Sequence, residues 1–128
     1  MRRRIGQIAL LVADYDDAIA WYRDRLGFDL IEDTAIGGGK RWVVVRPAGA
    51  ETGRLMARAE GDRQRAAIGD QSGGRVGFFL ITDDFARDHA AYAARGVRFL
   101  EPPRHEPYGT VAVFEDLYGN RWDLIAPK

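Results

Sequence analysis

The stretch IALLVADYDDAIAWYRDRLGF, residues 8–28, has the pattern of a buried strand, a helix cap and an amphipathic helix in direct succession. Its first six residues are apolar, and Asp14 follows as a candidate N-cap. The next apolar side chains recur at helical spacing, and Gly27 stands where helices commonly end. The stretch therefore predicts a strand over about residues 5–13 and a helix that ends at Gly27.

The same pattern returns later in the chain. Sliding the sequence along itself by 69 residues places Gly27 on Gly96. The second helix fits a shift of 70 better, so its N-cap is either Asp83 or Asp84, and the register of the strand before it stays open by one residue. Internal repetition of this kind indicates two copies of one supersecondary unit.

Each predicted helix is followed by three segments rich in β-branched and aromatic residues, which are typical of strands. These six segments are Phe28–Asp33, Arg41–Arg46, Gly53–Arg58, Val97–Glu101, Thr110–Glu115 and Arg121–Ala126. The prediction is an α+β fold, one domain over residues 1–128 built from tandem βαβββ modules at about residues 4–60 and 74–127, with a polar linker between them. Because neither half could bury its sheet alone, the modules must pair, either within the chain or across a dimer.

The composition argues against several classes of protein. Basic and acidic residues number 19 each, so no long-range attraction to nucleic acid or to an anionic membrane is expected. The apolar run after the basic residues 1–4 is too short for a membrane span or an export signal. The chain has no cysteine, which excludes disulfides and thiolate metal sites. We predict a cytoplasmic protein.

Three stretches together resemble the vicinal oxygen chelate superfamily, which includes glyoxalase I, bleomycin-resistance proteins, fosfomycin-resistance enzymes and extradiol dioxygenases. They are residues 8–28, ITDDFARDHAAYAARGVRF at residues 81–99, and PYGTVAVFEDLYGNRWDLI at residues 107–125. The resemblance implies a glyoxalase-like fold, with curved mixed sheets around a concave cavity. It does not imply one activity, because this fold supports many.

In metal-using members of that superfamily, four matching positions supply His and Glu ligands to a divalent ion. The resemblance places Gln7 at the first position and Val76 or Gly77 at its partner in the second half. Asp123 stands at the third, and the gapless shift places Arg54 at the fourth. Only Asp123 is a good ligand, and a fixed cation at Arg54 would oppose a metal. We therefore expect no metal cofactor; the alternative is Zn, Ni, Mn or Fe.

Asp123 lies just after DLYGN, residues 116–120, which has the composition of a hairpin turn and is interpreted as structural. Asp123 alternates with Trp122 and Leu124, so it faces away from two core positions and, by the resemblance, toward the cavity. One hypothesis is that Asp123 pairs with Arg54 there, since a buried carboxylate needs a partner. The other is that both side chains are solvated near strand ends.

The remaining candidates are aromatic and polar side chains that could border a cavity for a flat ligand. His105 lies in the proline-rich stretch EPPRHEPYG, predicted as a loop, whereas His89 falls on an apolar helical face and is interpreted as packing. Lys40 and Arg41 follow a glycine-rich hairpin tip and could meet an anionic ligand. The predicted ligand-binding set is Gln7, Trp42, Arg54, Met56, Phe78, His105, Tyr108 and Asp123.

Three functions remain open at this point. The first is a metal-free protein, expected to be a homodimer, that binds a small, flat, apolar organic molecule, as bleomycin-resistance proteins sequester a drug. The second is a lyase, isomerase or dioxygenase with an unusual metal site built on Asp123 and His105. The third is a metal-free enzyme that uses Asp123 or His105 as an acid–base group, which a perturbed ionisation in a closed pocket would favour.

Overall fold

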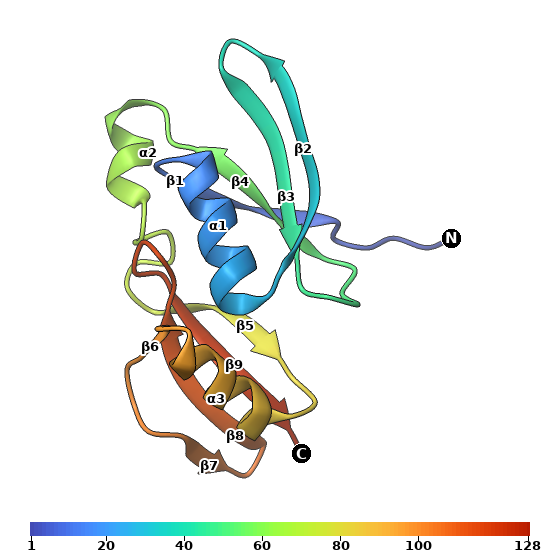
Figure 1. The fold of residues 1–128 in the computed structure, drawn as a ribbon, viewed down its shortest axis with the longest axis vertical. Helices are drawn as coiled ribbons and strands as arrows, with labels where there is room; N and C mark the ends of the chain where they lie inside the picture. Colours follow the sequence, from blue (N-terminus) through green and yellow to red (C-terminus); the bar gives the residue numbers. More distant parts are fainter. The chain divides into compact units, whose positions relative to one another are not determined.

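The computed structural model describes residues 1–128, and the chain divides into two units, Met1–Ile68 and Gly69–Lys128. The first unit contains β1 (Gln7–Val12), α1 (Tyr15–Leu26), β2 (Asp29–Gly37), β3 (Lys40–Arg46), β4 (Gly53–Arg58) and α2 (Gly61–Ala67). The second contains β5 (Val76–Ile81), α3 (Phe85–Ala94), β6 (Arg98–Phe99), β7 (Arg104–Glu106), β8 (Gly109–Glu115) and β9 (Arg121–Pro127). The mixed α+β fold with two open sheets predicted from the sequence is confirmed (Figure 1).

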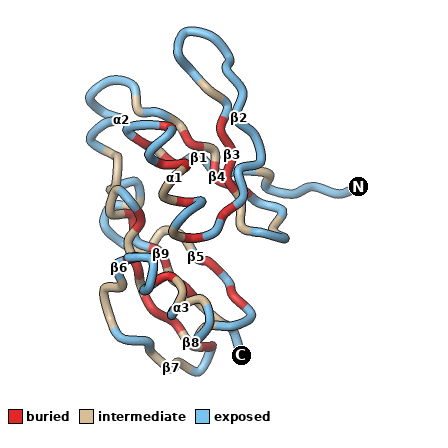
Figure 2. Tube along the Cα trace, in the orientation of Figure 1, coloured by how far each residue is buried: buried red, intermediate tan, exposed pale blue.

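The first unit is a four-stranded sheet in the order β1-β4-β3-β2. Its β1–β4 pair is parallel and its other pairs are antiparallel. Burial is concentrated in α1, β3 and β4, whereas β2 is exposed along its whole length (Figure 2). The sheet residues that are at most 1% exposed share the face that α1 covers; they are Leu10, Val12, Val43, Val45 and Met56.

Helix α1 begins and ends at the residues that the sequence indicated. The Asp14 side chain accepts a hydrogen bond of 2.9 Å from the backbone N–H of Asp17, which satisfies one of the free donors of the first turn. Gly27 closes the helix in the left-handed conformation, with φ of 71°, and its N–H bonds back to Arg23. Because an L side chain is strained at that φ, glycine suits this position.

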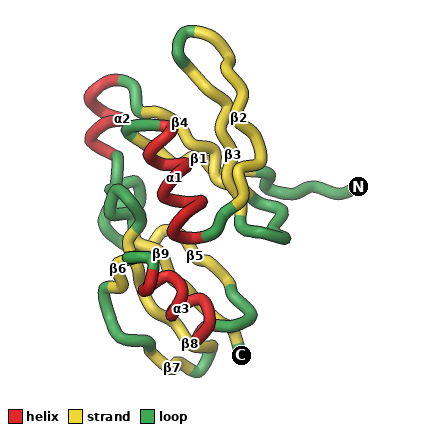
Figure 3. Tube along the Cα trace, viewed as in Figure 1, coloured by secondary structure: helices red, strands yellow, loops and turns green.

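The second unit has the sheet order β5-β9-β8-β6, with the short strand β7 also paired to β8. Helix α3 lies across this sheet, as α1 does in the first unit (Figure 3). Asp84 is the N-cap of α3, its side chain accepting from the N–H of Arg87 at 3.1 Å. Because Asp84 corresponds to Asp14, the helices of the two units begin at a shift of 70. The first strands share this shift from Phe78 onward, whereas β5 has a register irregularity between Val76 and Phe78.

Three strand predictions need correction. β2 runs on to Gly37, beyond the predicted end at Asp33, and β6 is only Arg98–Phe99. His105 was predicted in a loop but lies on β7, opposite Thr110 of β8. Proline at both ends of that segment hid a three-residue edge strand, because edge strands tolerate a missing donor.

No helix in this structure has both the length and the apolar character to cross a membrane.

The turn between β8 and β9 is structural, as the sequence indicated. Asp116 is 6% exposed, and its carboxylate accepts hydrogen bonds from the Asn120 and Tyr118 backbones at 2.9 and 3.1 Å. It also accepts from the side chains of Asn120 and Trp122, at 2.9 and 3.3 Å. Gly119 supplies the positive φ, 95°, that such a turn needs.

Candidate functional site

The sheet of the first unit opens between β3 and β4. The two strands pair only from Val43 to Val45, opposite Arg54 to Met56, although β3 starts at Lys40 and β4 continues to Arg58. Beyond these pairs the β2–β3 hairpin stays together, and β4 stays with β1. The hairpin carries two register irregularities, and bulges of this kind increase local twist. We attribute the separation of β3 from β4 to that twist.

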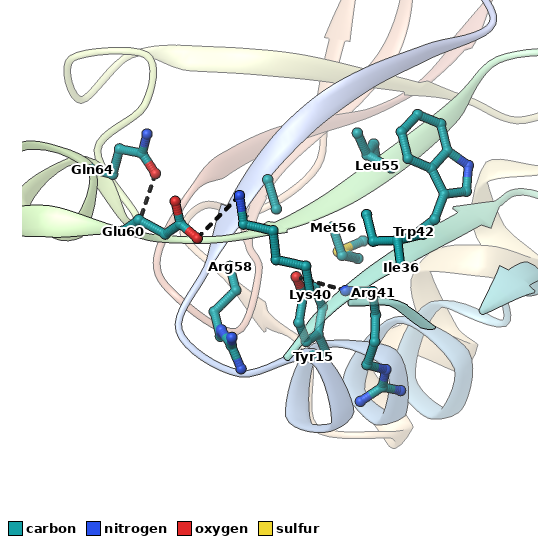
Figure 4. Close-up of a pocket in the computed structure, with 11 residues that line it drawn as sticks. Tyr15, Ile36, Lys40, Arg41, Trp42, Leu55, Met56, Arg58, Glu60 and Gln64 are labelled. Atoms are coloured by element: carbon teal, nitrogen blue, oxygen red, sulfur yellow. Dashed lines mark hydrogen bonds and ion pairs between the residues drawn. The ribbon is translucent and has the colours of Figure 1, made fainter. Parts of the chain in front are cut away.

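This separation leaves an open cavity of about 250 Å³, which we call the fork pocket (Figure 4). Its lining residues all belong to the first unit and are Tyr15, Ile36, Lys40, Arg41, Trp42, Leu55, Met56, Ala57, Arg58, Glu60 and Gln64. Side chains from both faces of the sheet reach the cavity, because the strands part there. The indole of Trp42 and the side chain of Leu55 form one side, and Trp42 remains 37% exposed.

The other side of the fork pocket is built around the ring of Tyr15, which is 6% exposed. The guanidinium carbons of Arg41 and Arg58 lie 5.1 and 5.2 Å from its ring centroid, which is cation–π range. The Tyr15 hydroxyl accepts from the backbone N–H of Arg41 at 3.2 Å. The phenol therefore positions two cations at the cavity wall.

Most charges at the fork pocket are paired. Arg41 contacts Asp33 at 2.7 Å and Asp16 at 2.9 Å, and the hydrogen bonds from its guanidinium lower the pKa of the Asp33 carboxyl. Lys40 contacts Glu60 at 3.4 Å, and the N–H of Glu60 donates to the Gln64 side chain. Arg58 differs from these cations, because it donates to the Gly39 carbonyl at 3.1 Å and has no carboxylate within ion-pair distance.

The second unit contains one carboxylate in an unfavourable environment, Asp123 on β9. Its Oδ1 atom is buried and has no hydrogen-bond partner. Burial raises the pKa of this carboxyl; the positive charge of Arg104 opposes that shift and the negative charge of Glu101 adds to it. Asp123 therefore holds a proton more readily than an ordinary aspartate.

Asp123→Asn is expected to raise the free energy of unfolding at pH 7. Because the folded-state pKa is raised, the wild-type side chain stabilises the fold when protonated and loses that stabilisation as the pH rises through its pKa. The advantage of the neutral amide should disappear below a pH of about 3.9, the usual aspartate pKa. Urea denaturation of both proteins across this pH range measures the difference. An amide variant that is less stable than wild type at pH 7, and not at low pH, would contradict the raised pKa.

Comparison with known proteins places the chain in a family. The model of the Glyoxalase/Bleomycin resistance protein/Dioxygenase superfamily matches residues 4–124. The chain belongs to this superfamily. An uncharacterized protein of Shewanella frigidimarina (strain NCIMB 400) is 54% identical over 127 residues, covering 98% of this chain and 94% of that protein. The resemblance that the sequence suggested is confirmed.

Two solved structures are similar to this chain over nearly its whole length. The antibiotic-binding protein TnmS3 from Streptomyces sp. CB03234 is 30% identical, with a TM-score of 0.83 and coverage of 99% of this chain and 98% of that one. The structure of UcmS2 is 29% identical, with a TM-score of 0.84 and 98% coverage of both chains. The two βαβββ units are thus arranged along the chain as in known glyoxalase-superfamily proteins.

The registers of the two sheets correct one assignment made from the sequence. Met56 on β4 pairs with Leu10 of β1 and Val43 of β3. Leu124 on β9 pairs in the same way with Leu80 of β5 and Ala112 of β8, so Met56 and Leu124 occupy equivalent positions in the two units. Leu55, not Arg54, therefore corresponds to Asp123. Arg54 lies on the opposite face of its strand, is 7% exposed and donates to the Ala9 carbonyl at 3.3 Å.

The residues at the four metal-ligand positions of the superfamily do not fit a divalent ion. They are Gln7, Leu55, Asp123 and, at the register irregularity of β5, Val76 or Gly77. Leucine, valine and glycine offer no side-chain donor, and glutamine offers only a neutral carbonyl. No three His, Cys, Asp or Glu side chains come together in a group that could hold a metal ion. We derive no reaction step that depends on a metal.

Two of the predicted ligand-binding residues, Trp42 and Met56, line the fork pocket, whereas Gln7 and Arg54 of the same unit do not. The other four belong to the second unit. Phe78 packs on Trp122 with ring centroids 4.9 Å apart. Nδ1 of His105 lies 3.3 Å from the Thr110 hydroxyl, and Tyr108 is 54% exposed. His89 packs between Phe85 and Phe99, consistent with its interpretation as a packing residue.

The sequence interpretation found only part of the cationic side of the fork pocket. It named Lys40 and Arg41 as residues that could meet an anionic ligand, but it gave no such role to Tyr15 or Arg58. Nothing in the sequence shows that β3 and β4 separate, which is what brings these residues to a cavity. The available signal was KRW, residues 40–42, where two cations precede a tryptophan just after the glycine-rich tip.

Proposed function

We propose that the chain binds a small, flat organic molecule in the fork pocket, without a metal, as a ligand-binding member of the superfamily. The observation that carries this proposal is the partly exposed indole of Trp42 beside an open cavity of about 250 Å³. A flat ring can stack on an indole, and stacking needs no catalytic group. Leu55, Met56 and Ala57 add apolar surface next to it.

Two further points support this function. TnmS3, which is an antibiotic-binding protein, shares 30% of its residues and nearly its whole length with this chain. Sequestering a drug or metabolite requires only a cavity of matching shape, stacking and a few charges, so a protein with this function can lack good metal ligands.

We also propose that the protein is a homodimer, since exposed apolar side chains such as Phe79 and Ile81 on β5 would be covered by a second copy.

The test is the binding of 2-naphthamide, a neutral two-ring probe, measured by isothermal titration calorimetry. Trp42→Ala should weaken binding about tenfold, because stacking on an aromatic side chain contributes about 1–3 kcal/mol. Trp21→Ala is the matched control, since Trp21 packs on Tyr22 of α1 and does not line the fork pocket. Equal binding by wild type and Trp42→Ala, with both folded, would remove the fork pocket as the site.

A second candidate is a metal-free enzyme with Asp123 as an acid. The raised pKa of this carboxyl, whose Oδ1 atom is buried, is the observation that favours it, because burial that raises a pKa lets a carboxyl keep its proton to a higher pH. Arg104, whose positive charge lowers that pKa, is itself paired with Glu101 and Glu106, both at 2.9 Å. His105 was the other acid–base candidate from the sequence, and its contact with Thr110 does not distinguish it.

A further inference from the structure

We propose that the ligand of the fork pocket is an aromatic anion, with its ring against Trp42 and its acidic group bound by the Arg58 guanidinium. This inference rests on the proposed binding function and names the ligand class for the same site. It concerns the side of the cavity opposite the indole, where Tyr15, Arg41 and Arg58 lie together (Figure 4).

The first argument is the difference between the three cations that line the cavity. Arg41 has two carboxylates within 2.9 Å, and Lys40 has Glu60 at 3.4 Å. Arg58 has none, although it lies at the same wall. The negative charge of Glu60, the one lining carboxylate, is offset by Lys40, so it opposes an incoming anion only weakly. An acidic ligand would thus find one cation that no protein carboxylate already neutralises.

The second argument is that Arg58 is held in place before any ligand arrives. One Nη donates to the Gly39 carbonyl at 3.1 Å, and the guanidinium lies over the Tyr15 ring at 5.2 Å. A guanidinium has five N–H donors in a fixed plane, and a single one is used in this bond. The remaining donors can meet a carboxylate in two parallel bonds, with little further loss of side-chain entropy.

The third argument concerns the two guanidinium groups beside one phenol ring. Their guanidinium carbons lie 5.1 and 5.2 Å from the ring centroid, and the carboxylates of Asp16 and Asp33 neutralise only the Arg41 side. A bound anion would supply the missing counter-charge to Arg58.

The experiment compares two probes of nearly the same shape, 2-naphthoate and 2-naphthamide, by calorimetry at physiological ionic strength. Wild type should bind the anion about tenfold more tightly than the amide, as expected for a charge-assisted pair. Arg58→Gln should lower the affinity for naphthoate to about that for the amide, so that the preference is lost, and Arg58→Lys should keep part of it. Arg98→Gln is the matched control, because it removes the same charge from a side chain that is 75% exposed on β6 of the second unit.

The outcomes separate this inference from the function on which it rests. If Arg58→Gln keeps the preference for naphthoate, or if wild type shows no preference, the ligand class is wrong although the pocket still binds rings. If neither probe binds wild type, the proposed binding function fails as well. If Arg98→Gln lowers naphthoate affinity as much as Arg58→Gln does, the effect is a general one of net charge, and the assignment to Arg58 is overturned.

Discussion

Replacing Phe114 by alanine is expected to lower the free energy of unfolding by about 4 kcal/mol, which removes a large part of the stability of a small domain. Phe114 is fully buried on β8. Its ring contacts those of Phe99, Trp122 and Tyr92, with centroids 5.7, 5.9 and 6.1 Å away. Alanine would leave a cavity that three fixed rings cannot fill, so both the transfer free energy and the packing are lost. Urea denaturation followed by circular dichroism measures the change.

Phe79→Ala is the matched control for Phe114→Ala. Phe79 lies in the same sheet, on β5, and is 60% exposed. The same truncation there should cost less than about 0.5 kcal/mol if the ring faces water. A loss at Phe114 below about 1.5 kcal/mol would contradict the packing described above. A large and concentration-dependent loss at Phe79 would instead indicate that a second copy covers it, in keeping with the proposed homodimer.

Helices α1 and α3 could be predicted from the sequence because their signals are local. Asp14 and Asp84 each accept a hydrogen bond from an N–H three residues later, and Gly27 takes the left-handed conformation that ends α1. The turn at residues 116–120 is local in the same way. Each of these features depends on a few neighbouring residues, and long-range contacts are not needed to specify it.

The strand register could not be obtained from one gapless shift. The first strands and helices of the two units correspond at a shift of 70, whereas Met56 and Leu124 correspond at 68. A slip of one residue moves a side chain to the other face of a sheet. That slip is why Arg54 was matched to Asp123 in place of Leu55. The position is a poor metal-ligand position with either residue, because leucine offers no side-chain donor and arginine carries a positive charge.

The fork pocket depends on non-local geometry and was only partly predictable. Trp42 could be selected because it is an aromatic residue on a predicted strand that was expected to border a cavity. Arg58 and Tyr15 are 43 residues apart in the chain, and they meet only because α1 packs on the sheet beside β4. The register irregularities of the β2–β3 hairpin, to which we attribute the parting of β3 from β4, leave no clear mark in the sequence.

Asp116→Ala is the other substitution with a large expected effect. It should lower the free energy of unfolding by about 3 kcal/mol. The Asp116 carboxylate accepts from two backbone N–H groups and from the side chains of Asn120 and Trp122, all in a buried site. Alanine would leave these donors without an acceptor, and each buried unsatisfied group costs about 1–3 kcal/mol before water or repacking compensates. The turn would lose its anchor, so β8 and β9 should separate more easily at this end. Hydrogen exchange of the Tyr118 and Asn120 amides, together with urea denaturation, measures both effects.

Asp83→Ala provides the comparison, because the Asp83 side chain is 89% exposed and has one ion pair, with Arg87 at 2.9 Å. A surface pair of this kind contributes about 0.5 kcal/mol or less, so this variant should remain close to wild type. If the two aspartate variants lost similar amounts, the hydrogen bonds of the turn would be worth no more than a surface pair. If Asp116→Ala lost stability without faster exchange at Tyr118 and Asn120, the loss would have to arise away from the turn. Only a large loss together with local exchange identifies the carboxylate as the group that holds the β8–β9 turn.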